Sequence, residues 1–548
     1  MNYKLKKMKT LIKANIWLMA TCLLTACAGE DTQQKDDARQ PEPNFVATFT
    51  GYQPATSTSA TTRTTATHVK GNPADVLWEA TDRIWVKADD GIFRQSDQAT
   101  FPTASNKAQA NFKLFAGAYH QFNPEVRYTN STNENTVIIR QNQTQTEAGK
   151  FNHLGASGDC GTATTIGGGG DYKFTLDHKA AFLCLYPRVE NAGLCPNVRL
   201  EKITVTSSTT PIAGTYDFSD GKIIDKTPTS PSNVITLSTN SAELLTVTSD
   251  AKSFCIVLCP NSSALTLDVV YTIKDPLTQV SVDISKSITE TFAEGNIYDY
   301  TAWLDKDIMF CTPQFFTWDA QREYWFGYEN EQPILSHEKP GATTSQNYPK
   351  LTTDPRWHHD NPSPGVPAPL AASRSCAICP TVNELCWYVM KGDPHHDSNK
   401  PWSFKGHLYK SGTWLKKKAT ILNENPSITD WRFTNRYPDA NGIDRDWRTE
   451  TSIKILENPL IGSYVAPSPT LSVTPKTTAI GNPDDYFFLP SLGSYLWDRN
   501  YYMSSVGYYW GRDASPNTLN AFALYCQSNK VYVGANNRIN GFVVQAFE

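Results

Sequence analysis

The sequence predicts a mainly β protein with the strand pattern of β-sandwiches. From residue 45 onward, short runs alternate apolar and polar side chains and are separated by Gly, Pro, Asn and Asp clusters. Helical periodicity is nearly absent over the same stretch. The chain has 14 Trp and 25 Tyr against 6 Met, which is typical of β-rich extracellular modules. Its 548 residues can bury two or three cores of ordinary domain size.

The N-terminus has the pattern of an export signal. An apolar run from Ile16 to Leu24 follows a lysine-rich stretch and, at roughly ten residues, is too short for a bilayer core that needs about 20. The run closes on Leu24-Thr25-Ala26-Cys27, which resembles the lipobox of bacterial lipoproteins and implies acylation of Cys27. We therefore expect a signal peptide over residues 1–27 and a lipid-anchored protein at the outer membrane and cell surface. An ordinary secretory signal with an incidental cysteine is the alternative.

Residues 28–44 are expected to form a flexible tether, because they lack apolar periodicity and are rich in Asp, Glu, Gln and Pro. The acidic residues close behind Cys27 resemble the export signals of some outer-leaflet lipoproteins, and a merely soluble linker explains them equally well. The net charge of −4 leaves no polycationic face, which disfavours a nucleic-acid partner.

Individual strands can be placed from the same alternation. The stretch from Ile166 to Asp171 lacks the Gly-Lys-Ser/Thr ending of a phosphate-binding loop, and no helix follows it, so we expect a flexible loop there. The expected strands are 45–49, 83–87, 136–139, 200–206, 234–237, 254–258 and 265–273.

An ordered set of short motifs resembles the fimbrillin family of anaerobic Gram-negative bacteria. In chain order, the motifs are Thr62-Arg63-Thr64, Trp78, Asp82 to Val86, Phe174 to Ala181, Ile212 to Tyr216 and Phe292 to Tyr298. The resemblance implies two fimbrillin-like β-sandwich domains, which we place at 45–175 and 176–304.

After Asp305 the chain becomes rich in Trp, Tyr, Pro, His and Asn, which indicates a separate domain over residues 305–548. Thr381 and Glu384 have the spacing of a capping box at the start of a short helix. The resemblance of this region is to paralogous surface domains with sulfatase-modifying and C-type-lectin-like folds, and it implies a mixed α+β, adhesive domain. The motifs that carry it are Cys379 to Glu384, Leu489 to Gly493, Gly507 to Trp510 and Arg538 to Val544.

Ten cysteines remain beyond Cys22 and Cys27, and an oxidising compartment would allow them to pair. Disulfides or buried thiols are favoured over zinc, because the spacing of the cysteines and nearby histidines fits no standard finger. The zinc-type group is Cys376, Cys379, Cys386, His395 and His396, and the disulfide options join Cys376 or Cys379 to Cys311, Cys386 or Cys526.

No catalytic or metal site is assigned from the sequence. The distant link to formylglycine-generating enzymes supplies no cysteine pair on that family's catalytic motif. Asn482 to Asp485 is similar to the triplets of calcium-binding lectins but departs from them in residue order, so a plain turn is favoured. Asp393 to Asp397 is likewise expected to be a turn with exposed polar groups. We expect no metal, no cofactor and no enzymatic activity.

Aromatic side chains dominate the last domain, and we expect most of them in its core and a minority exposed for binding sugar or protein. They are Trp402, Trp414, Trp431, Trp447, Trp497, Tyr501, Tyr502, Tyr508, Tyr509 and Trp510.

The fimbrillin resemblance also implies a mechanism of assembly. In that family an arginine-directed protease removes the first strand with its lipid, and the groove accepts a donor strand from the next subunit. Arg63 is the first candidate for the cut and Arg39 the second. Because a whole domain follows the second sandwich, we expect a fimbrial tip or accessory subunit that binds a host protein, another bacterium or a glycan. The alternatives are an independent surface lipoprotein that binds or processes glycans, and an anchor subunit.

Overall fold

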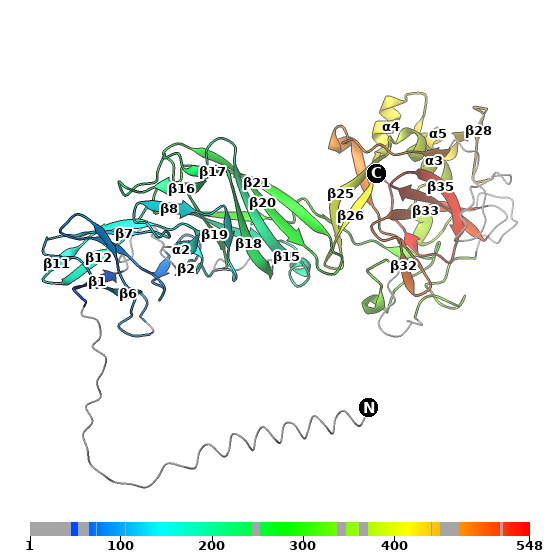
Figure 1. Cartoon of the computed structure of the whole chain (residues 1–548). Helices are drawn as coiled ribbons and strands as arrows, with labels where there is room; N and C mark the ends of the chain where they lie inside the picture. Colours follow the sequence, from blue (N-terminus) through cyan, green and yellow to red (C-terminus); the bar gives the residue numbers. More distant parts are fainter. Residues whose placement is uncertain are drawn as a thin grey trace, which may run out of the picture.

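The computed structural model of the chain shows three bodies in a row (Figure 1). Two β-sandwiches, coloured blue to green, precede a domain coloured from green through yellow to red, and the second sandwich lies in the middle. The architecture is mainly β, as the sequence predicts. The structure describes residues 45–52, 65–72, 74–104, 106–243, 252–336, 347–360, 371–439, 441–449, 471–515 and 519–547.

The first sandwich has a four-stranded and a five-stranded sheet around a core rich in rings. Trp78 lies edge-on to Phe112 at a centroid distance of 5.0 Å. In spatial order the first sheet is β11 (Ile166–Gly168), β12 (Asp171–Thr175), β1 (Ala47–Tyr52) and β6 (Gln109–Leu114). The second sheet is β13 (Asp177–His178), β10 (Gly161–Thr164), β7 (Glu125–Tyr128), β4 (Trp85–Lys87) and β5 (Phe93–Gln95), and β2 (Thr65–Thr67) pairs with β3 (Asp75–Leu77).

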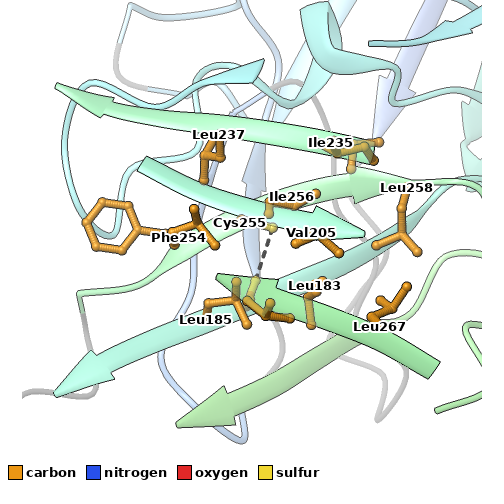
Figure 2. Packing of buried hydrophobic residues seen from close by; sticks show 14 of the residues in the cluster. Leu183, Leu185, Val205, Ile235, Leu237, Phe254, Cys255, Ile256, Leu258 and Leu267 are labelled. Atoms are coloured by element: carbon orange, nitrogen blue, oxygen red, sulfur yellow. Dashed lines mark hydrogen bonds between the residues drawn. The ribbon is translucent and has the colours of Figure 1, made fainter. Parts of the chain in front are cut away.

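The second sandwich has a larger, aliphatic core. Figure 2 shows Leu183 and Leu185 of one sheet facing Val205 and Leu267 of the other. Its three-stranded sheet is β19 (Phe254–Leu258), β14 (Ala181–Arg188) and β22 (Ile297–Trp303). Opposite lie β21 (Ser281–Glu290), β20 (Leu265–Lys274), β15 (Arg199–Ser207), β18 (Val234–Glu243) and β9 (Asn142–Thr144). A further sheet is β17 (Thr229–Ser232), β16 (Ala213–Asp217) and β8 (Thr136–Ile139), and the short helices are α2 (Leu154–Ser157) and η1 (Ala192–Leu194).

The order of the strands along the chain does not match the sandwich in which each strand packs. Val137, Ile139 and Leu154 precede several strands of the first sandwich, yet their side chains lie in the second core. They reach it because β8 pairs with β16 and β9 pairs with β18. The two sandwiches are therefore interleaved in sequence and share no simple cut point in the chain.

The C-terminal domain is built on a six-stranded sheet with packed side chains on both faces. In spatial order this sheet is β24 (Phe315–Phe316), β36 (Phe542–Val543), β33 (Val506–Ala514), β34 (Asn520–Gln527), β35 (Val531–Asn537) and β29 (Ser472–Val473). A four-stranded sheet is β23 (Met309–Phe310), β25 (His395–Phe404), β26 (His407–Lys416) and β30 (Tyr486–Pro490). The other elements are β27 (Tyr437–Pro438), β28 (Asp444–Arg445), β31 (Ser494–Leu496), β32 (Arg499–Tyr501), α3 (Val382–Lys391), α4 (Lys418–Glu424), α5 (Asp430–Asn435), η2 (Glu329–Glu331), η3 (Ser375–Ile378) and η5 (Pro483–Asp485).

The capping box predicted for α3 is confirmed. The Thr381 hydroxyl accepts from the Glu384 backbone N–H at 3.2 Å, and the Thr381 backbone N–H donates to the Glu384 carboxylate at 2.8 Å. Two N–H groups that the helix leaves without a partner are thereby satisfied.

The strand predictions are confirmed, most closely at β8 and β19, whereas the glycine-rich loop prediction is wrong. Residues 166–168 form the edge strand β11, which turns through Gly169 and Gly170 into β12. Both glycines have positive φ, 69° and 95°, a region that residues with a Cβ rarely occupy. The stretch is a tight hairpin because glycine supplies these angles at no steric cost.

Candidate functional site

Strand β1 is the element on which the first sandwich depends. It pairs in parallel with β12 over five residue pairs and antiparallel with β6 over six, so both of its edges are bonded. Bonds continue at its start, where Val46 N donates to Leu114 O at 2.7 Å and Thr48 N donates to Gly170 O at 2.8 Å. Loss of β1 would leave two facing rows of unpaired backbone groups, which is a template for another strand.

The inward side chains of β1 fit a shaped groove. Phe49 is fully buried, stacks on Tyr172 at 4.7 Å and meets Tyr119 edge-on at 5.5 Å. At Gly51 a Cβ would lie 2.8 Å from both the Phe174 and the Trp78 ring, closer than van der Waals contact allows. A strand in this groove therefore needs a ring at one inward position and glycine two residues later.

The residues that the sequence singled out for lipidation and cleavage, Cys27, Arg39 and Arg63, lie outside the described residues. Their order along the chain still separates the two candidate cuts. A cut after Arg39 leaves β1 on the protein, whereas a cut after Arg63 severs β1 from everything that follows. Only the second cut turns β1 into a strand held by non-covalent contacts alone.

A groove of about 710 Å³ lies on the C-terminal domain. The Glu323 carboxylate and the Lys405 ammonium give it opposite charges, and Phe404 and Ile378 give it apolar walls. Burial, with the nearby Glu329 carboxylate, raises the pKa of Glu323, and burial lowers the pKa of Lys405. Such a mixed lining suits a polar ligand that also presents an apolar face.

Of the ten aromatic side chains singled out in this domain, four are buried, four are half-buried and two are exposed. Trp402, Tyr508, Tyr509 and Trp510 lie in its cores. The exposed minority is clearest at Trp431 and Trp497, which are 61% and 55% exposed. The Arg436 guanidinium lies 5.4 Å from the Trp431 ring, which leaves the other face of that ring for solvent or a ligand.

The ten cysteines in the described part of the chain are free thiols, so none of the disulfide options from Cys376 or Cys379 is formed. The Cys376 sulfur instead accepts from Asp319 N at 3.1 Å. Nor do these cysteines gather with His395 and His396 into a group close enough to share an ion.

Two predicted turns have different outcomes. The turn at Asn482 is confirmed and forms the short helix η5. The Asp484 backbone N–H donates to the Asn482 side-chain oxygen at 3.3 Å. The prediction of exposed polar groups at Asp393 to Asp397 is wrong for His395. That residue begins β25, is buried, and bonds through Nδ1 to Thr478 O at 2.8 Å, because pairing with β26 carries it into the sheet.

One cluster of potential metal ligands was not predicted from the sequence. Within the described ranges, His68, Cys184 and Asp299 form the one group of three potential metal ligands whose donor atoms all lie within 4.8 Å of one another. No local spacing signals it, because its members are more than a hundred positions apart in the chain.

No family model and no curated protein matches the sequence. Among solved structures, a Bacteroides ovatus protein named for cell adhesion is 13% identical over 47% of this chain and 93% of its own, with a TM-score of 0.29. A Bacteroides uniformis protein of the same name is 16% identical over 47% and 94%, with a TM-score of 0.27. A Bacteroides ovatus fimbrial protein is 10% identical over 89% and 99%, with a TM-score of 0.21. Because these TM-scores are low, the function has to be inferred from the residues of this chain.

In the described part of the chain, no helix combines the length and the apolar character needed to cross a membrane.

Proposed function

We propose that this protein is a surface fimbrial tip or accessory subunit that joins its neighbour by strand exchange at β1. It reaches the surface as a lipoprotein acylated on Cys27, and a cut after Arg63 releases the lipid together with β1. The observation that carries the proposal is that β1 is bonded on both edges yet precedes the cut site, so cleavage creates a complete acceptor groove. The names of the similar Bacteroides proteins agree with this role.

The C-terminal domain supplies the adhesive function in this proposal. The last described strand, β36, is paired on both sides, with β24 and with β33, and Phe542 and Val543 are buried. Strand β36 is therefore integral to its own sheet and is not available to a neighbour as a donor. A subunit that accepts a strand at β1 and keeps β36 within its own sheet fits the end of a fibre, and the 710 Å³ groove offers a place for a host, bacterial or glycan ligand.

The strand exchange can be tested with a labelled peptide of residues 45–52 added to the protein after digestion by an arginine-specific protease. We expect the cut wild-type chain to take up the peptide, since backbone bonds and the Phe49 pocket drive insertion. The Gly51→Val peptide is the matched control. Its extra side chain meets two core rings, and overpacking of about 1–3 kcal/mol lowers uptake by roughly tenfold or more.

Two chain variants complete the test. Arg63→Ala keeps β1 covalently attached and is expected to take up no peptide, whereas Arg39→Ala is expected to behave as the wild type. Equal uptake by the Arg63→Ala chain, or equal uptake of the Gly51→Val peptide, would contradict strand exchange at β1. N-terminal sequencing of the cut protein shows whether it begins at Thr64.

A further inference from the structure

Three side chains on neighbouring strands of the second sandwich form a row across its three-stranded sheet. Cys184 on β14 is the register partner of Cys255 on β19 and of Asp299 on β22, so all three project from one face. That face is opposite to the one carrying Leu183 and Leu185, which enter the core in Figure 2. The two sulfurs are 3.1 Å apart, and Figure 2 marks this contact from Cys255 with a dashed line.

His68 covers this row. Its Nε2 lies 2.8 Å from Asp299 Oδ1, and the Cys184 sulfur is within 4.8 Å of both side chains' donor atoms. The His68 Nδ1 is buried and has no hydrogen-bond partner in the described part of the chain. A buried polar atom without a partner is unfavourable, so the cluster is incomplete as a set of hydrogen bonds.

We propose that His68, Cys184 and Asp299, with Cys255 as a fourth ligand, bind Zn²⁺ or a similar divalent transition-metal ion. Imidazole, thiolate and carboxylate are the ligand types that zinc takes, four at a time, at about 2.0–2.3 Å. Ligand atoms around such an ion lie roughly 3 to 4 Å apart, so the donor atoms of His68, Cys184 and Asp299, which lie within 4.8 Å of one another, have to approach by about 1 Å or less. The Cys255 sulfur lies outside that group and has to rotate toward the ion from its contact with Cys184. Each thiol gives its proton to solvent as the ion binds.

A disulfide between the two cysteines is the competing chemistry. The Cys255 N–H and C=O bond away from β14, to Gln145 and His153, so Cys184 and Cys255 form the close, non-hydrogen-bonded kind of antiparallel pair. Such a pair can form a disulfide, with Cα atoms at about 4.5 Å. A bound ion nevertheless explains the position of all four side chains, whereas a disulfide explains only the approach of the two cysteines and gives no role to His68 and Asp299.

The ion would fasten the segment 68–71 to β22. Hydrogen bonds already join them, from Gly71 N to Asp299 Oδ2 at 2.8 Å and from Lys70 Nζ to Thr301 Oγ1 at 2.6 Å. Because this segment follows Arg63 in the chain, the site would also secure the start of a cut protein. All four ligands are present in the uncut chain, so metal binding can be tested, and found or not found, whether or not strand exchange takes place.

The test is titration of the reduced, metal-free, uncut protein with Co²⁺, which reports thiolate ligation by its charge-transfer band and tetrahedral geometry by its d–d bands. We expect one Co²⁺ per chain, displaced by one Zn²⁺. Cys184→Ser should weaken the charge-transfer band, and the double variant Cys184→Ser with Cys255→Ser should abolish it. His68→Gln and Asp299→Asn lie outside the aliphatic core. Each should weaken Co²⁺ binding by at least about 10- to 100-fold, which is the loss typical when a residue that only supports a metal ligand is removed.

Cys259→Ser is the matched control, since it removes another buried thiol of the same core and should leave Co²⁺ binding unchanged. Three results would overturn the proposal. They are no Co²⁺ uptake by the reduced wild type, unchanged affinity in His68→Gln, and a Cys184–Cys255 disulfide found by mass spectrometry in the freshly isolated protein.

Discussion

At the scale of single residues, Asp513 places a carboxyl group in the interior of the C-terminal domain. Its side chain is fully buried, its Oδ2 accepts from Val382 N at 2.7 Å, and its Oδ1 has no hydrogen-bond partner within the described ranges. Burial raises the pKa of this carboxyl to about 7 from 3.8, although the bond from Val382 and the nearby arginines oppose the rise. The folded state therefore holds this proton more tightly than the unfolded chain does.

The sign of the pH effect follows from that difference. Below pH 3.8 the carboxyl is neutral in both states. Between 3.8 and about 7 the folded protein progressively loses stability, because the unfolded chain releases this proton while the folded protein still holds it. We expect Asp513→Asn to remove this loss, with a gain over the wild type that grows through this window to no more than about 4 kcal/mol, at about 1.4 kcal/mol per pKa unit.

Urea unfolding at a series of pH values measures this gain. Asp484→Asn, on the exposed turn of η5, is the control and should follow the wild-type profile. A constant offset between Asp513→Asn and the wild type from pH 4 to pH 8 would show that the carboxyl does not titrate in this window.

At the scale of elements, the outer edge of β19 is closed by side chains in place of a strand. Gln143 accepts from Val257 N at 3.0 Å and donates to Val257 O at 2.7 Å. Gln145 accepts from Cys255 N at 2.9 Å and donates to Ser253 O at 2.8 Å. The two amides thereby imitate the ladder of a neighbouring strand and protect a buried edge from other partners.

Gln143→Leu keeps the volume of the side chain and removes both of these bonds. Val257 N and O then remain buried without a partner, and we expect the free energy of unfolding to fall by about 2–6 kcal/mol, at about 1–3 kcal/mol for each of the two groups. Gln98→Leu, on the exposed surface of the first sandwich, is the control and should change stability by less than about 0.5 kcal/mol. Equal urea midpoints for the two variants would show that the amides do not hold the edge.

Strands were predictable where one face is buried, because alternation then appears directly in the sequence, as at β8 and β20. The hairpin of β11 and β12 was missed because glycines carry no hydrophobic pattern, although the same glycines enable its turn. The burial of His395 was missed because pairing with β26, and not local sequence, determines it. The cluster of His68, Cys184 and Asp299 depends on which strands become neighbours, and no short-range pattern records that.

At the scale of the whole molecule, the β25–β26 hairpin joins the C-terminal domain to the second sandwich. In Figure 1 its tip points into the junction. The Asp275 carboxylate, buried in the turn after β20, bonds to His407 Nδ1 at 2.9 Å and accepts from Leu408 N at 3.0 Å. Asn197 donates to Gly406 O at 3.1 Å beside them. These contacts fix the direction in which the C-terminal domain points relative to the second sandwich.

We expect His407→Ala to loosen this junction without unfolding either domain, because it removes a bond between domains and none within their sheets. Small-angle X-ray scattering should then show a broader distribution of interatomic distances at neutral pH. His120→Ala is the matched control, since it removes the equally short 2.8 Å contact to Asp89 at an exposed place within the first sandwich. Burial opposes ionisation of Asp275, but the His407 and backbone donors outweigh it and lower its pKa below 3.8. The wild-type junction should therefore stay rigid as the pH falls to about 4 and loosen only below that. A scattering curve for His407→Ala identical to that of the wild type would assign the rigidity to the backbone contacts at Gly406 and Leu408 instead.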